Sequence, residues 1–192
     1  METSVSLLDR LRTSPDEAAW RRLDGIYRPL ILQWLRRDPK LGEEADDVAQ
    51  EVMQVLIREL PRFQRQRNGS FRRWLRTITA HRVLAHVRSR QHRPVALGAP
   101  PEECPLAQLN DPNSELSRLW DDEHDQHVLR RLLELVEPMF EPTTLAAFRR
   151  VVFDEVGAAQ AAQELGLSVN AVLLAKSRVL SRLRQEAKGL ID

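Results

Sequence analysis

The stretch FQRQRNGSFRRWLRTITAHRVLAHVRSR, residues 63–90, decides how the rest of the chain is interpreted. It starts with a polar segment whose Asn-Gly pair is typical of a turn, and Ser70 can then cap a helix from Phe71 to about Gln91. Residues 60–93 contain ten Arg and neither Asp nor Glu. Because so many cations repel one another, the stretch indicates a surface that binds a partner carrying phosphates or carboxylates.

The aromatic residues of this expected helix allow two interpretations. Phe71 and Trp74 recur at helical spacing with Leu75 and Ile78, which is typical of a buried stripe. Aromatic faces also hold unstacked bases, so the same two rings could serve as stacking surfaces. The shared spacing with two aliphatic residues favours the core interpretation.

Charge is segregated into blocks along the chain, although the formal net charge is only +1. Residues 41–57 carry five acids and no Lys or Arg, whereas residues 102–125 carry eight acids and one Arg. Blocks of this kind are commonly solvated helix faces, and acids near a helix start also interact favourably with its dipole. The block at 41–57 therefore indicates either a stabilised helix start or a docking surface for a basic partner.

The composition favours helices throughout. Gly is rare, with seven in 192 residues, while Leu, Ala, Arg and Glu are frequent. Apolar residues recur at helical spacing over 16–37 and 45–59, with Pro29 expected to kink or divide the first helix and Pro61 to end the second. Ser114 can cap a further helix. An all-α fold is therefore predicted.

A proline-rich segment separates two groups of expected helices. Residues 94–112 contain five of the eleven prolines and show no sustained hydrophobic period. Such a composition is typical of an extended linker. The chain is therefore predicted to form two small helical domains, residues 1–93 and 113–192, joined by this linker.

The sequence AAQAAQELGLSVNAVLLAKSRVLSRLR, residues 158–184, has the form of a helix-turn-helix. Gly166 can adopt the positive φ of a sharp turn, and Ala162 is small enough for two helices to approach closely. The second helix, starting near Ser168, would then lie in a DNA major groove. The residues expected nearest the bases are Ser168, Asn170 and Ala171, and those expected at phosphates are Lys176, Arg178, Arg182 and Arg184. An ordinary helical hairpin with a basic tail is the alternative.

The sequence contains no recognisable catalytic constellation or Gly-rich phosphate loop. His124 and His127 lie beside carboxylates, but a metal site needs three or four converging ligands, and the rest of the chain supplies none clearly. We therefore expect no catalytic residue, metal, cofactor or small-molecule substrate. The single Cys104 excludes an internal disulfide, and no signal peptide or spanning segment is recognised, so a cytoplasmic location without a membrane partner is expected.

Taken together, the chain resembles the extracytoplasmic-function (ECF) sigma factors of the sigma-70 family. Region two of that family is similar to ADDVAQEVMQVLIRELPRF (45–63) followed by GSFRRWLRTITAHRVLAHVRSR (69–90). Region four is similar to FEPTTLAAFRRVVFDEVGAAQAAQELGLSVNAVLLAKSRVLSRLR (140–184). The resemblance spans residues 16–188 and implies a promoter-specificity subunit of bacterial RNA polymerase, located on the nucleoid when bound to polymerase, that promotes transcription initiation and is not itself an enzyme.

The resemblance also implies roles for single residues. The acid-rich helix would dock on the β′ coiled-coil of core RNA polymerase through Asp46, Asp47, Gln50 and Glu51. The basic loop and helix would recognise and melt the minus-ten element of promoter DNA through Arg65, Arg67, Asn68, Ser70, Arg72, Arg73, Arg76 and Arg82. The acidic linker resembles the family's connector through the polymerase.

Region four would bind the minus-thirty-five element as duplex DNA and touch the polymerase β flap. Leu173 and Leu174 stand where many relatives carry polar or basic residues, so they could contact thymine methyls or pack against a neighbouring helix. An anti-sigma factor is a further possible partner, because factors of this class are often held by one.

Two other functions fit parts of the pattern. A conventional helix-turn-helix repressor or activator would use the basic helix only for added duplex affinity, and an adaptor protein would use its charge blocks to bind other proteins. The acid block and the order of the two domains favour a sigma factor over both.

Overall fold

The computed structural model describes residues 6–14, 16–64, 70–91 and 104–191, and this part of the chain is helical without any strand. The predicted all-α class is confirmed. The α-helices are α1 (Leu7–Thr13), α2 (Glu17–Leu35), α3 (Ala45–Glu59), α4 (Ser70–Gln91), α5 (Glu115–Val136), α6 (Pro142–Val152), α7 (Ala158–Leu165) and α8 (Val169–Ala187). Short 3-10 helices are η1 (Gly42–Glu44), η2 (Leu60–Arg62), η3 (Pro105–Asn110) and η4 (Glu137–Met139). Within these ranges, every helix is too short or too polar to cross a membrane.

Side-chain caps explain where several helices begin. The Asp16 carboxylate accepts from the Ala19 amide at 2.7 Å, so α2 starts at the next residue. Ser114 caps α5 as predicted, by accepting from the Ser117 amide at 3.1 Å. Ser70, however, is the first residue of α4 and lies inside the helix, so its predicted role as the residue before the helix is wrong.

Pro29 lies inside α2, which continues from Glu17 to Leu35 and is not divided. Proline has no N–H and its ring clashes with the preceding turn, so the Gly25 carbonyl, four residues earlier, lacks its helical donor. Helix α5 contacts this carbonyl and that of the next residue, Ile26. The Arg131 Nε donates to the Gly25 carbonyl at 3.1 Å, and the His127 Nε2 lies 2.7 Å from the Ile26 carbonyl. Arg131 of α5 thus supplies a donor to the carbonyl that Pro29 leaves without one, and His127 adds a contact one residue further along α2.

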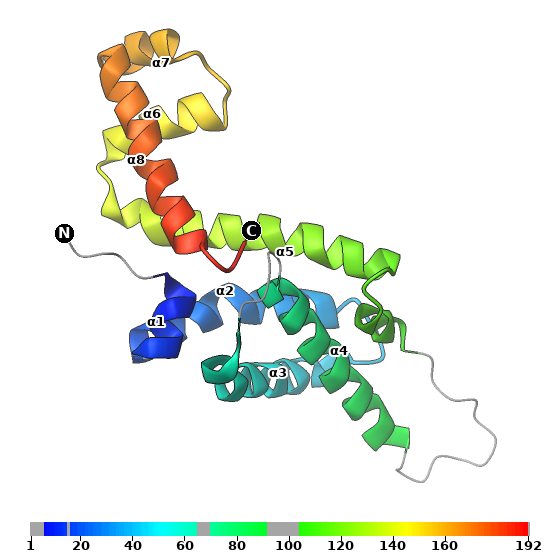
Figure 1. The fold of residues 1–192 in the computed structure, drawn as a ribbon. Coiled ribbons are helices and arrows are strands. Elements are labelled where there is room, and N and C mark those ends of the chain that lie inside the picture. Colours follow the sequence, from blue (N-terminus) through cyan, green and yellow to red (C-terminus); the bar gives the residue numbers. More distant parts are fainter. Residues whose placement is uncertain (1–5, 15, 65–69, 92–103, 192) are drawn as a thin grey trace.

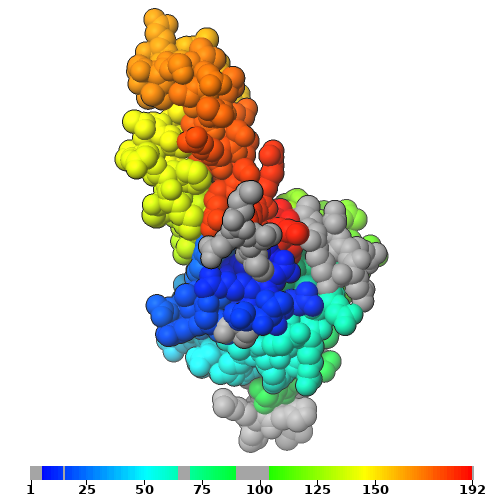
Figure 2. All heavy atoms as spheres, turned by 60° about the vertical axis from the view of Figure 1, so that its left-hand side comes forward, coloured from blue at the N-terminus to red at the C-terminus, as the bar shows by residue number. Residues whose placement is uncertain are grey.

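Helix α5 lies across α2 and α4, and α6, α7 and α8 project away from this body (Figures 1 and 2). One large core joins α1–α5, Phe148 of α6 and the C-terminal part of α8, and the bulkiest of its fully buried side chains are Trp34, Trp120, Tyr27, Phe71 and Phe148. A second, smaller cluster holds α6 and α7 against α8 through Ala147, Ala161, Ala162, Val172 and Ala175. In this conformation the two predicted domains therefore share a core through α5.

The predicted linker is only partly within the described residues. Its C-terminal part is η3, whose Leu106 and Leu109 are buried against α4 and α5. An extended conformation is therefore wrong for residues 105–110, because their two leucines contribute to the large core.

Candidate functional site

The predicted docking residues form one solvent-facing patch on α3. Asp46, Asp47, Gln50 and Glu51 are all exposed, while Val48, Ala49, Val52 and Met53 of the same helix are buried. This division follows from the 3.6-residue period of the helix. Asp46 also accepts from Arg36 at 3.1 Å, but both side chains are well exposed, and such a pair contributes little to stability. The patch is accessible and predominantly acidic.

A pocket of about 530 Å³ lies at the N-terminus of α4. The Phe63 and Trp74 rings stack there, with centroids 4.7 Å apart and an interplanar angle of 27°. The Ser70 hydroxyl is buried and has no hydrogen-bond partner among the described residues. The residues lining the pocket are Arg62, Phe63, Gln64, Ser70, Arg73, Trp74 and Thr77.

The pocket changes how the sequence is interpreted. Phe71 is buried, which confirms its predicted place in the core, but Trp74 is only half-buried and also lines the pocket. Four lining residues were not predicted as site residues, namely Arg62, Phe63, Gln64 and Thr77. The signal available in the sequence was that Arg62, Phe63 and Gln64 follow the expected helix 45–59 and closely precede the expected helix that contains Thr77. The predicted Arg65, Arg67 and Asn68 lie outside the described residues.

The other predicted arginines of α4 differ in their surroundings. Arg73 lines the pocket and Arg82 is half-exposed further along the helix. Arg72 and Arg76, in contrast, bind acids of α5: Arg72 Nη1 donates to Asp125 Oδ2 at 2.5 Å, and Arg76 Nη1 donates to Asp121 Oδ1 at 2.8 Å.

The pairing is reflected in pKa values and burial. Burial by itself would lower the pKa of Arg72, but the neighbouring carboxylates, Asp125 first, outweigh burial and raise it. For Asp125, burial raises the pKa, but the hydrogen bonds from His124 and Arg72 outweigh burial. The pKa of Asp125 is therefore lowered. Arg76 is only 3% exposed, so in this conformation it offers no surface to DNA.

Aromatic and polar contacts hold α5 in place. Trp120 packs on Trp34 with centroids 5.0 Å apart, and His124 stacks on Tyr27 at 5.7 Å. Glu123 accepts from Arg37 at 2.6 Å. Burial is the main cause that lowers the pKa of His124 and His127, so the fold favours the neutral form of both imidazoles. Both histidines therefore contact α2, His124 through the Tyr27 ring and His127 through the Ile26 carbonyl.

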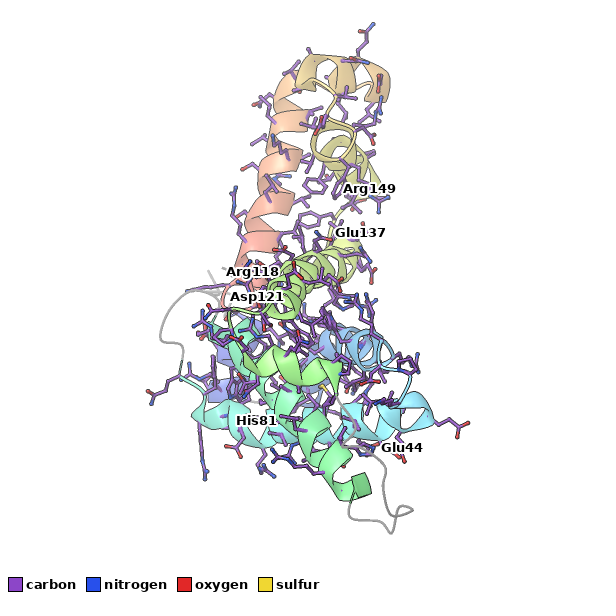
Figure 3. The ribbon with its side chains drawn as sticks, turned by 90° about the vertical axis from the view of Figure 1, so that its right-hand side faces the viewer. Glu44, His81, Arg118, Asp121, Glu137 and Arg149 are labelled. Carbon is purple, nitrogen blue, oxygen red and sulfur yellow. The ribbon has the colours of Figure 1, made fainter. Side chains whose placement is uncertain are left out.

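The α7–α8 pair has the geometry expected from its sequence. Gly166 has φ of +65°, in the left-handed region, and the Leu167 amide donates to the Ala162 carbonyl at 2.9 Å. The Ser168 hydroxyl accepts from the Ala171 amide at 3.1 Å and so caps α8. The Glu137–Arg149 ion pair joins η4 to α6, the helix that precedes this pair (Figure 3).

The predicted duplex-contacting residues lie largely on the outside of α8. Ser168, Asn170 and Arg178 are exposed, and Ala171 and Lys176 are half-exposed. Arg182 differs, because it donates to Glu186 at 2.5 Å. The apolar side chains Val169, Leu173 and Leu174 are 44%, 49% and 46% exposed, so none of them packs into a neighbouring helix in this structure.

Comparison with known proteins agrees with this geometry. The family model of sigma-70 region 2 matches residues 25–93. The ECF RNA polymerase sigma factor SigD of Mycobacterium tuberculosis is 31% identical over 176 residues, which cover 89% of this chain and 78% of SigD. The ECF RNA polymerase sigma factor RpoE of Cereibacter sphaeroides is 26% identical over 189 residues, covering 94% and 93% of the two chains. An acidic patch on α3, an arginine-rich α4 and a capped α7–α8 turn thus occur in a chain that belongs to the ECF sigma factors of the sigma-70 family.

Proposed function

We propose that this sigma factor, whose partners are core RNA polymerase and promoter DNA, uses three separate surfaces. The acidic patch of α3 binds the basic β′ coiled-coil of the core enzyme. The pocket at the start of α4 holds an unpaired base of the minus-ten element, and the N-terminal turns of α8 read the minus-thirty-five element as duplex. Contact with the β flap, control by an anti-sigma factor and a cytoplasmic location belong to the same proposal.

The observation that carries the proposal is the pocket at the start of α4. It combines a stacked aromatic pair, Phe63 and Trp74, with the cations Arg62 and Arg73 and a Ser70 hydroxyl that has no partner in the part of the chain that the structure describes. Proteins hold single strands with this combination of aromatic stacking and positive charge, and stacking contributes about 1–3 kcal/mol per base. Since unpairing a base costs a few kcal/mol, such a pocket offsets the opening of the duplex.

The acidic patch of α3 supports polymerase docking. Its four polar side chains are exposed on one face, and the opposite face is buried in the large core, so charge changes on the patch should leave the fold intact. Complementary charge speeds and orients protein association. A basic partner surface is therefore the natural complement of the patch.

The exposed leucines of α8 support a particular mode of duplex reading. Leu173 and Leu174 are not used in packing, and Asn170 and Arg178 lie on the same helix beside them. In the major groove, the thymine methyl group is the feature that apolar side chains contact, whereas an asparagine side chain pairs with adenine. We therefore expect the minus-thirty-five element to contain thymines opposite the two leucines.

The direct test of the function is reconstitution. The full chain is combined with sigma-free core polymerase, and a genomic promoter library is scored for initiation and strand opening. Asp46→Arg with Asp47→Arg should abolish polymerase binding, whereas Glu115→Arg with Asp122→Arg, two exposed acids of α5, should not. Operator-like duplex binding without initiation from any promoter would instead indicate a conventional transcriptional regulator.

The reading of thymine methyls has its own test. In a promoter recovered from that library, each thymine of the minus-thirty-five element is replaced by deoxyuridine, which removes only the methyl group. The wild-type holoenzyme should lose affinity by about fivefold or more at one or two positions, because an apolar contact disappears. Leu173→Ser with Leu174→Ser should bind both DNAs equally. Equal binding of both DNAs by the wild type would contradict the role of the leucines.

A further inference from the structure

A cluster of four charged side chains lies where α4 crosses α5. Asp121 accepts from Arg76 at 2.8 Å and lies 3.3 Å from Arg72, and Asp125 accepts from Arg72 at 2.5 Å. Arg76 also donates to the Ser117 carbonyl at 3.2 Å. Both arginines belong to the helix proposed to hold the minus-ten strand. In this structure their N–H groups donate to carboxylates of α5, so these groups are not available to DNA phosphates.

The cluster leaves part of the arginines' hydrogen-bonding capacity unused. The Nε–H groups of Arg72 and Arg76 are buried; that of Arg76 has no hydrogen-bond acceptor within the described ranges, and that of Arg72 lies 3.3 Å from Asp121 Oδ1 without forming a hydrogen bond. A guanidinium has five N–H donors in a planar fork that fits the oxygens of carboxylate or phosphate equally well. A buried donor without an acceptor is costly, so the α5 carboxylates are an incomplete substitute for a multidentate anion.

The remaining contacts of α5 make this arrangement stable in the free chain. Trp120, Val128 and Leu132 are fully buried, Arg131 donates to the Gly25 carbonyl that Pro29 leaves without a helical donor, and His127 contacts the Ile26 carbonyl. Opening therefore exposes apolar surface and leaves the Gly25 carbonyl without its α5 donor. Only a partner that binds the open form more tightly can shift such an equilibrium.

We propose that α5 is an internal competitor of promoter DNA: Asp121 and Asp125 cover Arg72 and Arg76 in the free chain, and α5 leaves α4 when the chain joins polymerase. This proposal rests on the proposed function, because it assigns the uncovered arginines to the minus-ten strand. The free chain then binds single-stranded promoter DNA weakly, and the polymerase complex binds it with two more phosphate contacts.

The first test measures binding of the free full-length chain to a single-stranded oligonucleotide carrying the non-template minus-ten sequence recovered from the promoter library. Asp121→Asn with Asp125→Asn should raise the affinity by about tenfold and steepen the log–log salt dependence by about 1.4, as expected for two added phosphate contacts on a single strand. The matched control, Glu115→Gln with Glu155→Gln, removes the same charge from exposed positions that make no contact with the cluster. It should change the affinity less than about twofold and leave the salt dependence unchanged. Equal gains in both variants would overturn the proposal.

The second test needs no variant and so does not depend on how the substitutions fold. Amide hydrogen exchange of residues 115–125 is measured in the free chain and in the initiating polymerase–promoter complex. Protection of this segment should fall, or its pattern change, on assembly, together with loss of the contacts to α4. If polymerase complexes initiate normally while this segment keeps the exchange of the free chain, the internal competition is wrong and the proposed function stands. If no promoter is initiated, the proposed function itself fails.

Discussion

The two surfaces proposed to meet promoter DNA differ in how accessible they are. On α4, Arg76 is 3% exposed and is held by an acid of α5. On α8, Leu173 is 49% exposed and Ser168 and Asn170 face solvent. The duplex-reading surface is therefore available in the free chain, whereas part of the strand-holding surface is covered. The comparison shows that net charge of a helix does not measure its capacity to bind nucleic acid, because neighbouring helices decide which cations are free.

Removing Trp120 should have the largest effect on the difference in accessibility between α4 and α8. Trp120→Ala leaves a cavity against Trp34 in the shared core and should destabilise the chain by about 3–5 kcal/mol, loosening the helix that covers α4. Urea unfolding measures the loss. Leu129→Ala on the exposed side of the same helix should change stability by less than about 0.5 kcal/mol. Similar losses for both variants would mean that α5 is not anchored by its aromatic face.

The proline contact sharpens the account of how α5 is held. Arg131→Ala leaves the Gly25 carbonyl without its donor and should cost about 1–3 kcal/mol. In a Pro29→Ala background the helix can supply its own N–H, so the same substitution should cost about 1 kcal/mol less. Urea unfolding of the four proteins in the double-mutant cycle gives this coupling. Arg130→Ala, an exposed neighbour, should show no coupling with Pro29.

The exposed α8 surface depends on its turn. Gly166→Ala places a side chain at φ of +65°, where no neighbouring atom obstructs it but the backbone is strained, so we expect a loss of about 1–2 kcal/mol. Gly157→Ala should change stability by no more than about 0.5 kcal/mol, because its φ is ordinary at −59° and the lower entropy of the unfolded chain offsets the weaker N-cap of α7. Hydrogen exchange of α7 and the start of α8 should show the loss locally. Equal effects at both glycines would contradict the role of the turn.

Acidification should loosen the cover on α4 more modestly. The pKa values of His124 and His127 are lowered from 6.5, mainly by burial, although the Asp125 carboxylate acts in the opposite direction on His124. The fold therefore favours both neutral imidazoles. Their contribution to stability is fully present above pH 6.5 and is lost as the pH falls through the lowered pKa values. Unfolding free energies at about pH 7.5 and about pH 5.5 measure the difference.

Two variants check this pH dependence. His124→Gln with His127→Gln should reduce the stability difference between the two pH values, whereas His81→Gln, at an exposed position of α4, should leave it unchanged. A difference that persists without the two buried histidines would place the responsible groups elsewhere.

The helical architecture could be predicted because it depends on local patterns. Period, capping residues and a turn glycine fix the limits of α3, the cap of α5 and the α7–α8 turn. Phe71 was predicted to be buried because it shares a face with Leu75, and it is.

The cover on α4 could not be predicted in the same way. Asp125 pairs with Arg72 across 53 residues, and a charge block shows that acids are present without showing which cations they meet. A usable signal was Pro29 inside an apolar helix pattern, since it leaves the Gly25 carbonyl without its helical donor. The α4 pocket was missed for a similar reason, because its aromatic pair joins Phe63, which follows η2, to Trp74 of α4.

The burial of η3 against α4 has a consequence for spacing. The segment 92–103 leaves from the end of α4, and the chain returns to α4 at Leu106 and Leu109. Its length therefore does not set the distance from α4 to α6–α8 in the closed form. That distance is set by α5, a 22-residue helix about 33 Å long. Changes in the number of residues within 92–103 should therefore leave the separation of the two surfaces proposed to meet DNA unchanged while α5 lies on α4.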